Sequence, residues 1–481
     1  MNKTTQTTLV SSLIFQKVIG FGLFVIFLLS LYWRYFDPRQ FVNENPLLIL
    51  GVSAVSWGLV SVGYFLRKIW QLPLEQPVTM RQSVFILSLT WSLAILTSSI
   101  LYVLSGFPDP AGEFGNFRVW VDAIFESTSG FATVGSSILP SVEAFPKSIL
   151  AWRMMTHFIG GMGIIYFFFT IFPRTLIKRE EVQNSEAEGP NYIHYPEDGD
   201  VRRAGWKFLA VYGVLIFVLS CLLMISGALF RRTPYQYVQD NIFESVSYAV
   251  STVATGGFAV HDTSVGLPLE NGLKGGLQNP VSEWIIAIFM IFSAISFGIW
   301  YLLLFRPGLI RHIRHSTELF TYLGIMAGAI GVVFVTLWRS DTYLTLEETA
   351  RYAVFNIATV FTTTGLGNAN FHLWPAGATA ILFLFYFVSG MTGSTTGGLK
   401  LTRYLILFRY SWMKLYNFVY GKFKTRFTID GVRYDERQAS LVVITVFFYF
   451  FLMIIGTIGI LLVSPTAEFV DGTTREVDLI S

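Results

Sequence analysis

Long apolar segments follow one another along most of this 481-residue chain. A bilayer core about 30 Å thick needs roughly 20 apolar residues in one helix. The segments that meet this length are expected at residues 13–33, 47–66, 82–104, 147–172, 206–229, 281–305, 319–338, 374–408 and 438–463. The pattern therefore predicts an all-α polytopic membrane protein. Its first apolar segment is too long for a cleaved signal peptide and predicts a retained helix.

Three shorter apolar stretches lie between the long ones, at residues 119–131, 241–253 and 349–361. A stretch of about a dozen residues cannot cross the bilayer and predicts a re-entrant half-helix. Each stretch leads into a glycine-containing turn and then, after a further exposed stretch, into another long apolar segment. The unit of helix, half-helix, glycine turn and helix thus occurs three times. A repeat in phase is strong evidence for a shared structural role.

The three turns align on a glycine that follows small or hydroxyl residues. They read Ala132-Thr133-Val134-Gly135, Ala254-Thr255-Gly256-Gly257 and Thr362-Thr363-Thr364-Gly365. A ring of backbone carbonyls can replace the hydration shell of a potassium ion, and glycine adopts the unusual backbone angles that such a ring needs. The carboxyl end of each half-helix would direct partial negative charge at the same ion. The turns are therefore the predicted filter, and the alternative is ordinary Gly/Thr-rich helix packing.

A second glycine-rich segment interrupts the apolar run at 374–408. It contains Gly390, Gly393, Ser394, Thr395, Thr396, Gly397, Gly398 and Lys400. A helix with this sequence is expected to break, and the break must lie against protein or a water-filled cavity. Below a filter it would form a movable gate, with Lys400 opposing cations electrostatically. The alternative is a cytoplasmic helix end from which Lys400 reaches the interface.

Composition supports the membrane interpretation. Hydrophobic residues make up 53% of the chain and charged residues 14%, whereas a soluble protein carries about 25% charged residues. A net charge of +3 gives no support to nucleic-acid binding. The single Cys221 excludes a disulfide framework or a cysteine metal site. Basic residues gather in alternate loops, near 67–81, 173–207, 306–318 and 400–437, which places these loops and the amino terminus in the cytoplasm.

These motifs resemble those of the Trk/Ktr superfamily of potassium transporters. The matching stretches are FESTSG at 125–130, HFIGGMGII at 157–165, GGFAVHD at 256–262 and GMTGSTTGGLK at 390–400. The helix pair before the first repeat is similar to that of the Trk-type membrane subunit. The resemblance implies tandem helix–pore-loop–helix repeats around a pseudo-fourfold pore, potassium uptake through a carbonyl filter, and an intramembrane gate at the last stretch.

On this basis the chain divides into an ordered series of segments. They are an extra helix pair (1–75), pore repeat 1 (76–175), pore repeat 2 (200–306), pore repeat 3 with a broken inner helix (318–412), the first helix of an incomplete repeat 4 (434–464) and a polar tail (465–481). The tail shows no half-helix, glycine turn or closing helix. The sequence therefore predicts a copy that is truncated in its fourth repeat.

The resemblance also implies partners and a location. Potassium would be the transported substrate, bound at the filter residues, with no organic cofactor. The chain would contact membrane lipid, form a homodimer and bind a cytoplasmic nucleotide-binding regulatory subunit of the TrkA type. It would lie in the cytoplasmic (inner) membrane of a bacterium as a multi-pass protein with its amino terminus inside.

Three other functions are alternatives to potassium uptake. A truncated, non-conducting fragment could assemble with a full-length homologue or inhibit it. A broken-helix secondary transporter for organic solutes would usually show inverted repeats, whereas these repeats run in the same orientation. An intramembrane enzyme would need paired carboxylates, a metal cluster or a nucleophile–base pair, and the sequence offers none inside its spans.

Several polar residues near the turns have smaller expected roles. Glu126, Glu244 and Asn356 lie in the three half-helices, where they would support the filter, attract cations or simply form hydrogen bonds at a helix end or interface. His261 and Asp262 follow the second turn, and their side chains are expected to form hydrogen bonds at the outer mouth of the pore.

Overall fold

The computed structural model describes most of the chain. The described residues are 3–36, 44–72, 80–106, 117–139, 141–166, 201–230, 238–266, 277, 279–305, 313–314, 316–421, 425–430, 432–463, 466–468 and 474–476. The chain forms two compact units, Met1–Gly398 and Leu399–Ser481. All three predicted turns lie in the first unit.

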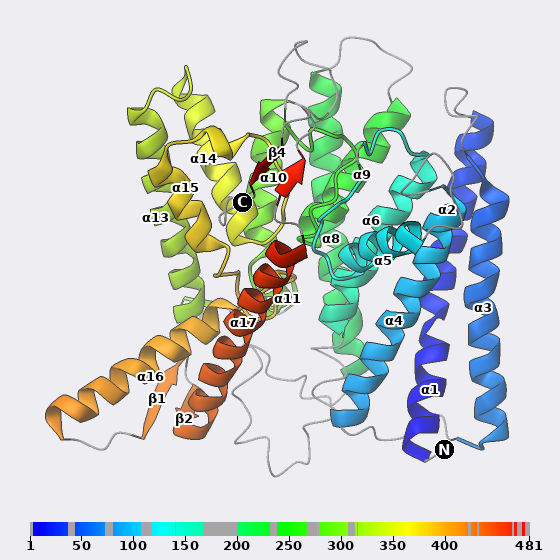
Figure 1. Cartoon of the computed structure of the whole chain (residues 1–481), viewed down its shortest axis with the longest axis horizontal. Coiled ribbons are helices and arrows are strands. Elements are labelled where there is room, and N and C mark those ends of the chain that lie inside the picture. Colours follow the sequence, from blue (N-terminus) through cyan, green and yellow to red (C-terminus); the bar gives the residue numbers. More distant parts are fainter. Residues whose placement is uncertain are drawn as a thin grey trace. The chain divides into compact units, whose positions relative to one another are not determined.

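The first unit begins with a group of long helices (Figure 1). They are α1 (Lys3–Phe15), α2 (Lys17–Phe36), α3 (Pro46–Ile69) and α4 (Met80–Leu104). Helix α1 starts ten residues before the predicted span at 13–33. Near its end the Ser12 hydroxyl, and just after it the Gln16 amide, donate to backbone carbonyls of α4 at 3.2 Å each. These bonds satisfy polar side chains that lie among apolar helices.

The rest of the first unit repeats one arrangement three times. The half-helices are α5 (Phe117–Phe131), α9 (Val238–Val253) and α14 (Leu346–Phe361). The helices around them are α4 and α6 (Lys147–Tyr166), then α8 (Val201–Leu229), α10 (Pro280–Ser293) and α11 (Phe297–Phe305), then α13 (Thr317–Arg339) and α15 (Ala376–Phe385), which follows a single 3-10 turn, η3 (Phe371–Leu373). Each half-helix packs against the helix before it. All three end at the residues that the sequence predicts.

Side-chain caps fix where several of these helices begin. Asn279 accepts from the Ser282 N–H and is followed by Pro280, which starts α10. The half-helix α14 begins at a capping box, in which Thr345 and Glu348 each accept from the other's backbone N–H. A capped start and a glycine turn at the end give a half-helix of defined length.

Two predicted spans are interrupted. The stretch at 281–305 was expected to be one helix, but α10 and α11 meet at a 95° bend. The run at 374–408 breaks between α15 and residue 401, where the sequence predicts the gate. Within the described ranges, six helices are long and apolar enough to cross a membrane, or seven if the bent pair counts as one span. The all-helical, multi-span fold with broken helices agrees with the sequence prediction.

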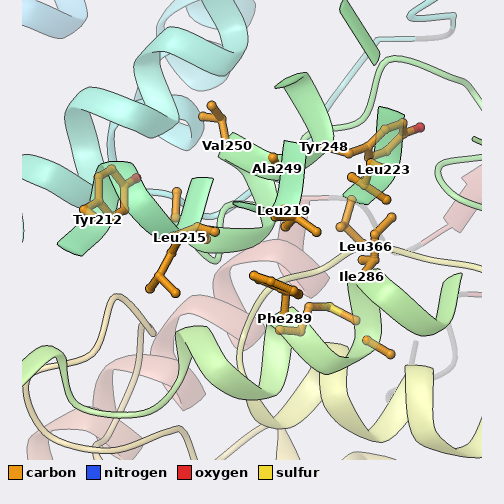
Figure 2. Packing of buried hydrophobic residues seen from close by; sticks show 14 of the residues in the cluster. Tyr212, Leu215, Leu219, Leu223, Tyr248, Ala249, Val250, Ile286, Phe289 and Leu366 are labelled. Atoms are coloured by element: carbon orange, nitrogen blue, oxygen red, sulfur yellow. The ribbon is translucent and has the colours of Figure 1, made fainter. Parts of the chain in front are cut away.

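The largest group of buried hydrophobic residues lies in the second repeat. Figure 2 shows Tyr212, Leu215, Leu219 and Leu223 of α8 with Tyr248 and Ile286 from the two following helices. Leu366, one residue after the third glycine, joins the same group and is 0% exposed. The group therefore anchors the third turn against the helices of the second repeat.

The second unit contains α16 (Leu401–Tyr420), the hairpin β1 (Arg426–Ile429) and β2 (Val432–Asp435), α17 (Glu436–Val463) and a second hairpin, β3 (Thr466–Glu468) with β4 (Thr474–Glu476). Helix α17 agrees with the predicted span at 438–463. The two short antiparallel hairpins were not predicted. In the first, Arg426 pairs with Asp435 and Ile429 with Val432, and in the second, Thr466 pairs with Glu476.

Candidate ion-conduction site

The three half-helices end in the same unusual backbone conformation. Thr133, Thr255 and Thr363 have φ angles of 52°, 51° and 53°, in the left-handed region that side chains other than glycine rarely occupy. In each turn the threonine N–H bonds three residues back and the next N–H bonds five residues back, which is the pattern of a Schellman cap. A non-glycine residue in this conformation costs of order 1–3 kcal/mol. A cost repeated three times in phase indicates a functional constraint.

The glycines of the turns face one another. Gly135, Gly257 and Gly365 have φ angles of 78°, 88° and 84°. A Cβ on Gly135 would lie 2.1 Å from the Gly256 carbonyl oxygen, and one on Gly257 would lie 2.2 Å from the Thr364 carbonyl oxygen. Only glycine fits at these two positions.

The glycine of the third turn approaches the first turn in the same way, but at a longer distance. A Cβ on Gly365 would have the Val134 carbonyl oxygen as its nearest neighbour, at 3.7 Å. In all three turns, the carbonyl before one glycine therefore approaches the glycine of another turn. The three predicted turns thus converge, and their backbone oxygens adjoin.

A buried ion pair supports the first turn. Arg153 of α6 donates to Glu126 of α5 at 2.7 Å and 3.0 Å, and both side chains are at most 1% exposed. Arg153 also donates to the Ser137 hydroxyl at 3.2 Å and to the Ala259 carbonyl at 3.3 Å. One guanidinium therefore links the half-helix of the first repeat with the segments that leave the first and second turns.

An imidazole lies one helical turn further along α6. His157 is 0% exposed. Its Nδ1 is 2.8 Å from the Gly130 carbonyl oxygen, and its Nε2 is 3.2 Å from the Phe258 backbone nitrogen. Its ring stacks on Phe258 with centroids 4.3 Å apart. His157 therefore contacts the end of one half-helix and the residue that follows the glycine of the next turn.

A second buried ion pair supports the third turn. Arg351 of α14 donates to Glu283 of α10 at 2.7 Å. The same carboxylate oxygen accepts from Asn368 at 2.6 Å, and Asn368 in turn accepts from Asn356 at 2.9 Å. Residue 368 lies just beyond Gly365, so this network holds the segment that leaves the third turn.

The predicted gate segment hydrogen-bonds directly to the third turn and to the end of the second half-helix. The Gly397 N–H donates to the Thr363 hydroxyl at 2.8 Å. The Thr395 hydroxyl donates to the Val253 carbonyl, at the end of the second half-helix, at 3.0 Å. Gly393, Ser394, Thr396 and Gly398 belong to the same unit, and Ser394 and Thr396 are buried.

The other end of this segment fills the bend between α10 and α11. The Met391 N–H donates to the Ala294 carbonyl at 3.0 Å, and the Phe297 N–H donates to the Gly393 carbonyl at 2.8 Å. Gly390 packs so closely that a Cβ would lie 2.8 Å from that of Ala294. The loop therefore supplies partners for backbone groups that the break in the helix leaves free, which is a condition for irregular backbone at membrane depth.

Two further residues complete the surroundings of the gate segment. Glu318, at the start of α13, accepts from the Thr392 N–H at 2.7 Å. Lys400 precedes the first residue of α16 and belongs to the second unit. Its predicted opposition to cations in the pore therefore stays a prediction.

A carboxylate–imidazole cluster lies outside the turns. His261 is 3.2 Å from Glu143 and 3.3 Å from Glu244, which lies on α9. Asp262 accepts from the Ser141 hydroxyl at 2.8 Å. Burial alone would lower the pKa of His261, but its hydrogen bonds and charge interactions with Glu244 and Glu143 outweigh burial and raise that pKa above the usual value. The predicted hydrogen bonds of His261 and Asp262 are confirmed.

Sequence reasoning found the turns but missed most of the side chains that hold them. Glu126, Glu244 and Asn356 were singled out, and each proves to be a hydrogen-bonding partner near a turn. The residues missed are Arg153, His157, Glu283, Glu318, Arg351 and Asn368. A signal was present for Arg153 and Glu283, since a charged residue inside an apolar span usually has a buried partner and a function.

Comparison with known proteins places the chain in a family. The family model described as TrkH, cation transport protein, matches residues 63–470. Among its relatives are the Trk system potassium uptake protein TrkH of Halomonas elongata, 27% identical over 79% of this chain and 73% of that one, and TrkG of Escherichia coli K12, 26% identical over 74% and 70%.

The fold has a solved counterpart. The crystal structure of the potassium transporter TrkH from Vibrio parahaemolyticus matches with a TM-score of 0.70 at 20% identity, over 93% of this chain and 86% of that one. From the family match and the converging turns together, this chain is a member of the TrkH family of cation transport proteins.

Proposed function

We propose that this chain is the membrane subunit of a Trk system and takes up potassium through a filter formed by its glycine turns. The observation that carries the proposal is the convergence of three turns with the same pair of positive φ angles. The names of the two curated relatives, which describe Trk system potassium uptake proteins, support the choice of potassium.

The filter would consist of the carbonyl and hydroxyl oxygens of twelve residues. They are Ala132, Thr133, Val134, Gly135, Ala254, Thr255, Gly256, Gly257, Thr362, Thr363, Thr364 and Gly365. Carbonyl dipoles can stand in for the water shell of potassium without burying full charges. The left-handed threonine turns the chain sharply at the end of each half-helix, so that the carboxyl end of the helix and the carbonyls after it serve the same ion.

The segment from Gly390 to Lys400 would act as the gate. Its contacts with Thr363 and Val253 tie it to the third turn and to the end of the second half-helix. Its contacts with the bend between α10 and α11 give it a second anchor. Hydrogen bonds of this kind are worth only about 1 kcal/mol each, so a regulatory signal can release the segment without unfolding the protein.

The remaining parts of the proposal rest on family resemblance and charge distribution. The chain would lie in the cytoplasmic (inner) membrane of a bacterium, with its amino terminus and basic loops inside. It would act as a homodimer, with a TrkA-type nucleotide-binding subunit on the basic loops. The division into an extra helix pair and successive pore repeats follows the boundaries given above.

Rubidium uptake tests the proposal. The full chain is expressed in cells that lack their own potassium uptake systems, and the initial rate of rubidium entry is measured. We expect uptake above background, and we expect Gly257→Ser to abolish it, because any Cβ there meets the Thr364 carbonyl oxygen. Gly213→Ser is the matched control, since Gly213 lies on α8 of the same repeat with nothing within 4 Å of an added Cβ.

The outcomes separate clearly when the amount of protein in the membrane is measured alongside. Loss of uptake in Gly257→Ser with normal uptake in Gly213→Ser supports the filter. Uptake that survives Gly257→Ser unchanged would show that the turns are not the conduction path.

A further inference from the structure

His157 joins the filter turns of two different repeats. The residue lies on α6, belongs to the first repeat and is fully buried. Its two ring nitrogens contact two backbone groups, the Gly130 carbonyl at 2.8 Å and the Phe258 N–H at 3.2 Å. Gly130 lies in the last turn of the first half-helix, and Phe258 directly follows the second glycine. One imidazole therefore spans the junction between two turns.

The two contacts fix the tautomer of the ring. A backbone N–H can only donate, so Nε2 must accept from Phe258 and carries no proton. A carbonyl can only accept, so Nδ1 carries the proton and donates to Gly130. Both nitrogens are satisfied only in this neutral form. The ring is therefore a fixed donor–acceptor bridge.

The donor side of the bridge reaches the first turn directly. The Gly130 carbonyl also accepts from the Thr133 N–H at 3.1 Å, which is one of the two bonds that hold Thr133 in its left-handed conformation. Thr156, beside His157 on α6, packs against the same glycine, where an added Cβ would lie 2.2 Å from its hydroxyl. The position of α6 thus sets the position of the first turn.

The acceptor side packs against the second turn. A Cβ on Gly256 would lie 2.2 Å from the Cδ2 atom of the His157 ring. The ring stacks on Phe258 at an interplanar angle of 20°, and the Arg153 guanidinium lies 4.0 Å from the centroid of the same Phe258 ring. The imidazole therefore contacts both the backbone of the second turn and the aromatic ring of Phe258, which follows that turn.

We propose that His157 is a positioning residue that sets the distance between the first and second turns and so favours potassium over sodium. The inference rests on the proposed function. Sodium is smaller than potassium, so the turns must approach one another to coordinate it. A donor–acceptor bridge of fixed length between the turns resists this approach. Without the bridge, the two turns can contract, and sodium competes better for the site.

Three substitutions dissect the bridge. His157→Asn keeps an amide donor near the position of Nδ1, and His157→Gln places an amide oxygen near the position of Nε2. His157→Leu removes both contacts. The matched control is Met154→Leu, which lies on the same helix, is 4% exposed and changes little in volume.

The readout is the ratio of sodium to rubidium uptake at equal amounts of membrane-inserted protein. We expect this ratio to rise most in His157→Leu, to rise less in His157→Asn and His157→Gln, and to stay unchanged in Met154→Leu. A purely structural role would lower both uptakes together and leave the ratio constant. Should His157→Leu fail to reach the membrane, His157→Asn and His157→Gln, which each keep one of the two contacts, test the proposal through the same sodium-to-rubidium ratio.

The failures of the two proposals are distinguishable. If the unmodified chain takes up no rubidium, the proposed function is wrong. If the unmodified chain takes up rubidium and every His157 variant keeps its sodium-to-rubidium ratio, the filter stands and the role of His157 is wrong.

Discussion

The junction between the first and second turns differs from the junction between the second and third. At the first junction, Arg153 and His157 project from one uninterrupted helix, α6, and contact backbone on both sides. At the second junction, partners come from Glu283 on the bent α10 and from the loop after α15. At both junctions the segments that leave the two turns also bond directly, Ser141 to Asp262 at the first and the Val265 N–H to the Gly367 carbonyl at the second. The helix contacts at the first junction thus come from one uninterrupted element, and those at the second from a broken helix and a loop.

The difference suggests a division of labour within the filter. A helix that keeps its hydrogen bonds holds its contacts in one geometry, so the first junction is suited to selectivity. A loop bound by a few hydrogen bonds can leave, so the second junction is suited to gating. Movement of the loop would remove the partner of Thr363 and loosen the third turn, while the first two turns stay together.

The largest expected effect is a difference in rubidium uptake between substitutions of Gly135 and Gly365, the glycines of the first and third turns. Gly135→Ala should abolish rubidium uptake, because its Cβ would lie 2.1 Å from a backbone oxygen of the second turn. Gly365→Ala should retain part of the uptake, since its nearest neighbour is 3.7 Å away and only the strain of a positive φ is added. Initial rates at matched protein levels measure both. Equal loss in both variants would contradict the tighter packing of the first junction.

The next effect concerns the two buried ion pairs. Arg153→Met leaves Glu126 buried without its cation, which should cost about 3–5 kcal/mol of stability. Arg351→Met should cost a similar amount, because each carboxylate keeps a neutral hydrogen-bond donor, Ser137 for Glu126 and Asn368 for Glu283. Thermal unfolding of the purified protein in detergent compares the variants. As a control, the double variant Glu126→Gln with Arg153→Met should recover part of the loss, and failure to do so would contradict a charge-based cause.

A smaller effect is expected at the contact between loop and filter. Thr395→Val removes the hydroxyl of the loop that donates to the Val253 carbonyl, a loss of about 1 kcal/mol and therefore roughly a fivefold shift in the loop's equilibrium. Basal rubidium uptake should rise if the loop is the gate. Thr395→Ser keeps the hydroxyl and should behave like the unmodified chain. Identical uptake in Thr395→Val would argue against a gating contact.

The smallest effect is a pH dependence at the outer cluster. The imidazolium of His261 faces Glu143 and Glu244, with Tyr248 and Asp262 beside it. Because its pKa is raised in the folded protein, the stabilisation is fully present below about pH 6.5 and is lost as the pH rises through the raised pKa. Its size should stay below about 1 kcal/mol, since the group is partly exposed.

Melting temperatures between about pH 6 and about pH 9 measure this dependence. The unmodified chain should lose some stability across this range, as two carboxylates are left without the charge between them. His261→Asn should flatten the profile. A profile that is unchanged by His261→Asn would show that another group titrates.

The sequence predicted the parts of this site that depend on local signals. The half-helices end at Phe131, Val253 and Phe361 as expected, because the glycine turn that ends each one is encoded in the next few residues. The gate break was also visible, since four glycines in an apolar run cannot continue a helix at low cost.

The parts that were missed depend on residues far apart in the chain. The bend after α10 is stabilised by backbone groups of the loop that begins at Gly390. The contact of His157 with Phe258 joins residues 101 positions apart. The positive φ of Thr133 runs against the local preference of threonine, so only the completed fold can account for it. Patterns along a chain carry little information on such contacts.

Anomalous diffraction from crystals grown with rubidium tests the central claim most directly. The expected result is a peak of rubidium density within coordination distance of the carbonyl oxygens of Val134, Gly256 and Thr364, and its loss in Gly257→Ser. Rubidium bound elsewhere along the pore, with none between these three oxygens, would contradict the assignment of the turns as the potassium filter.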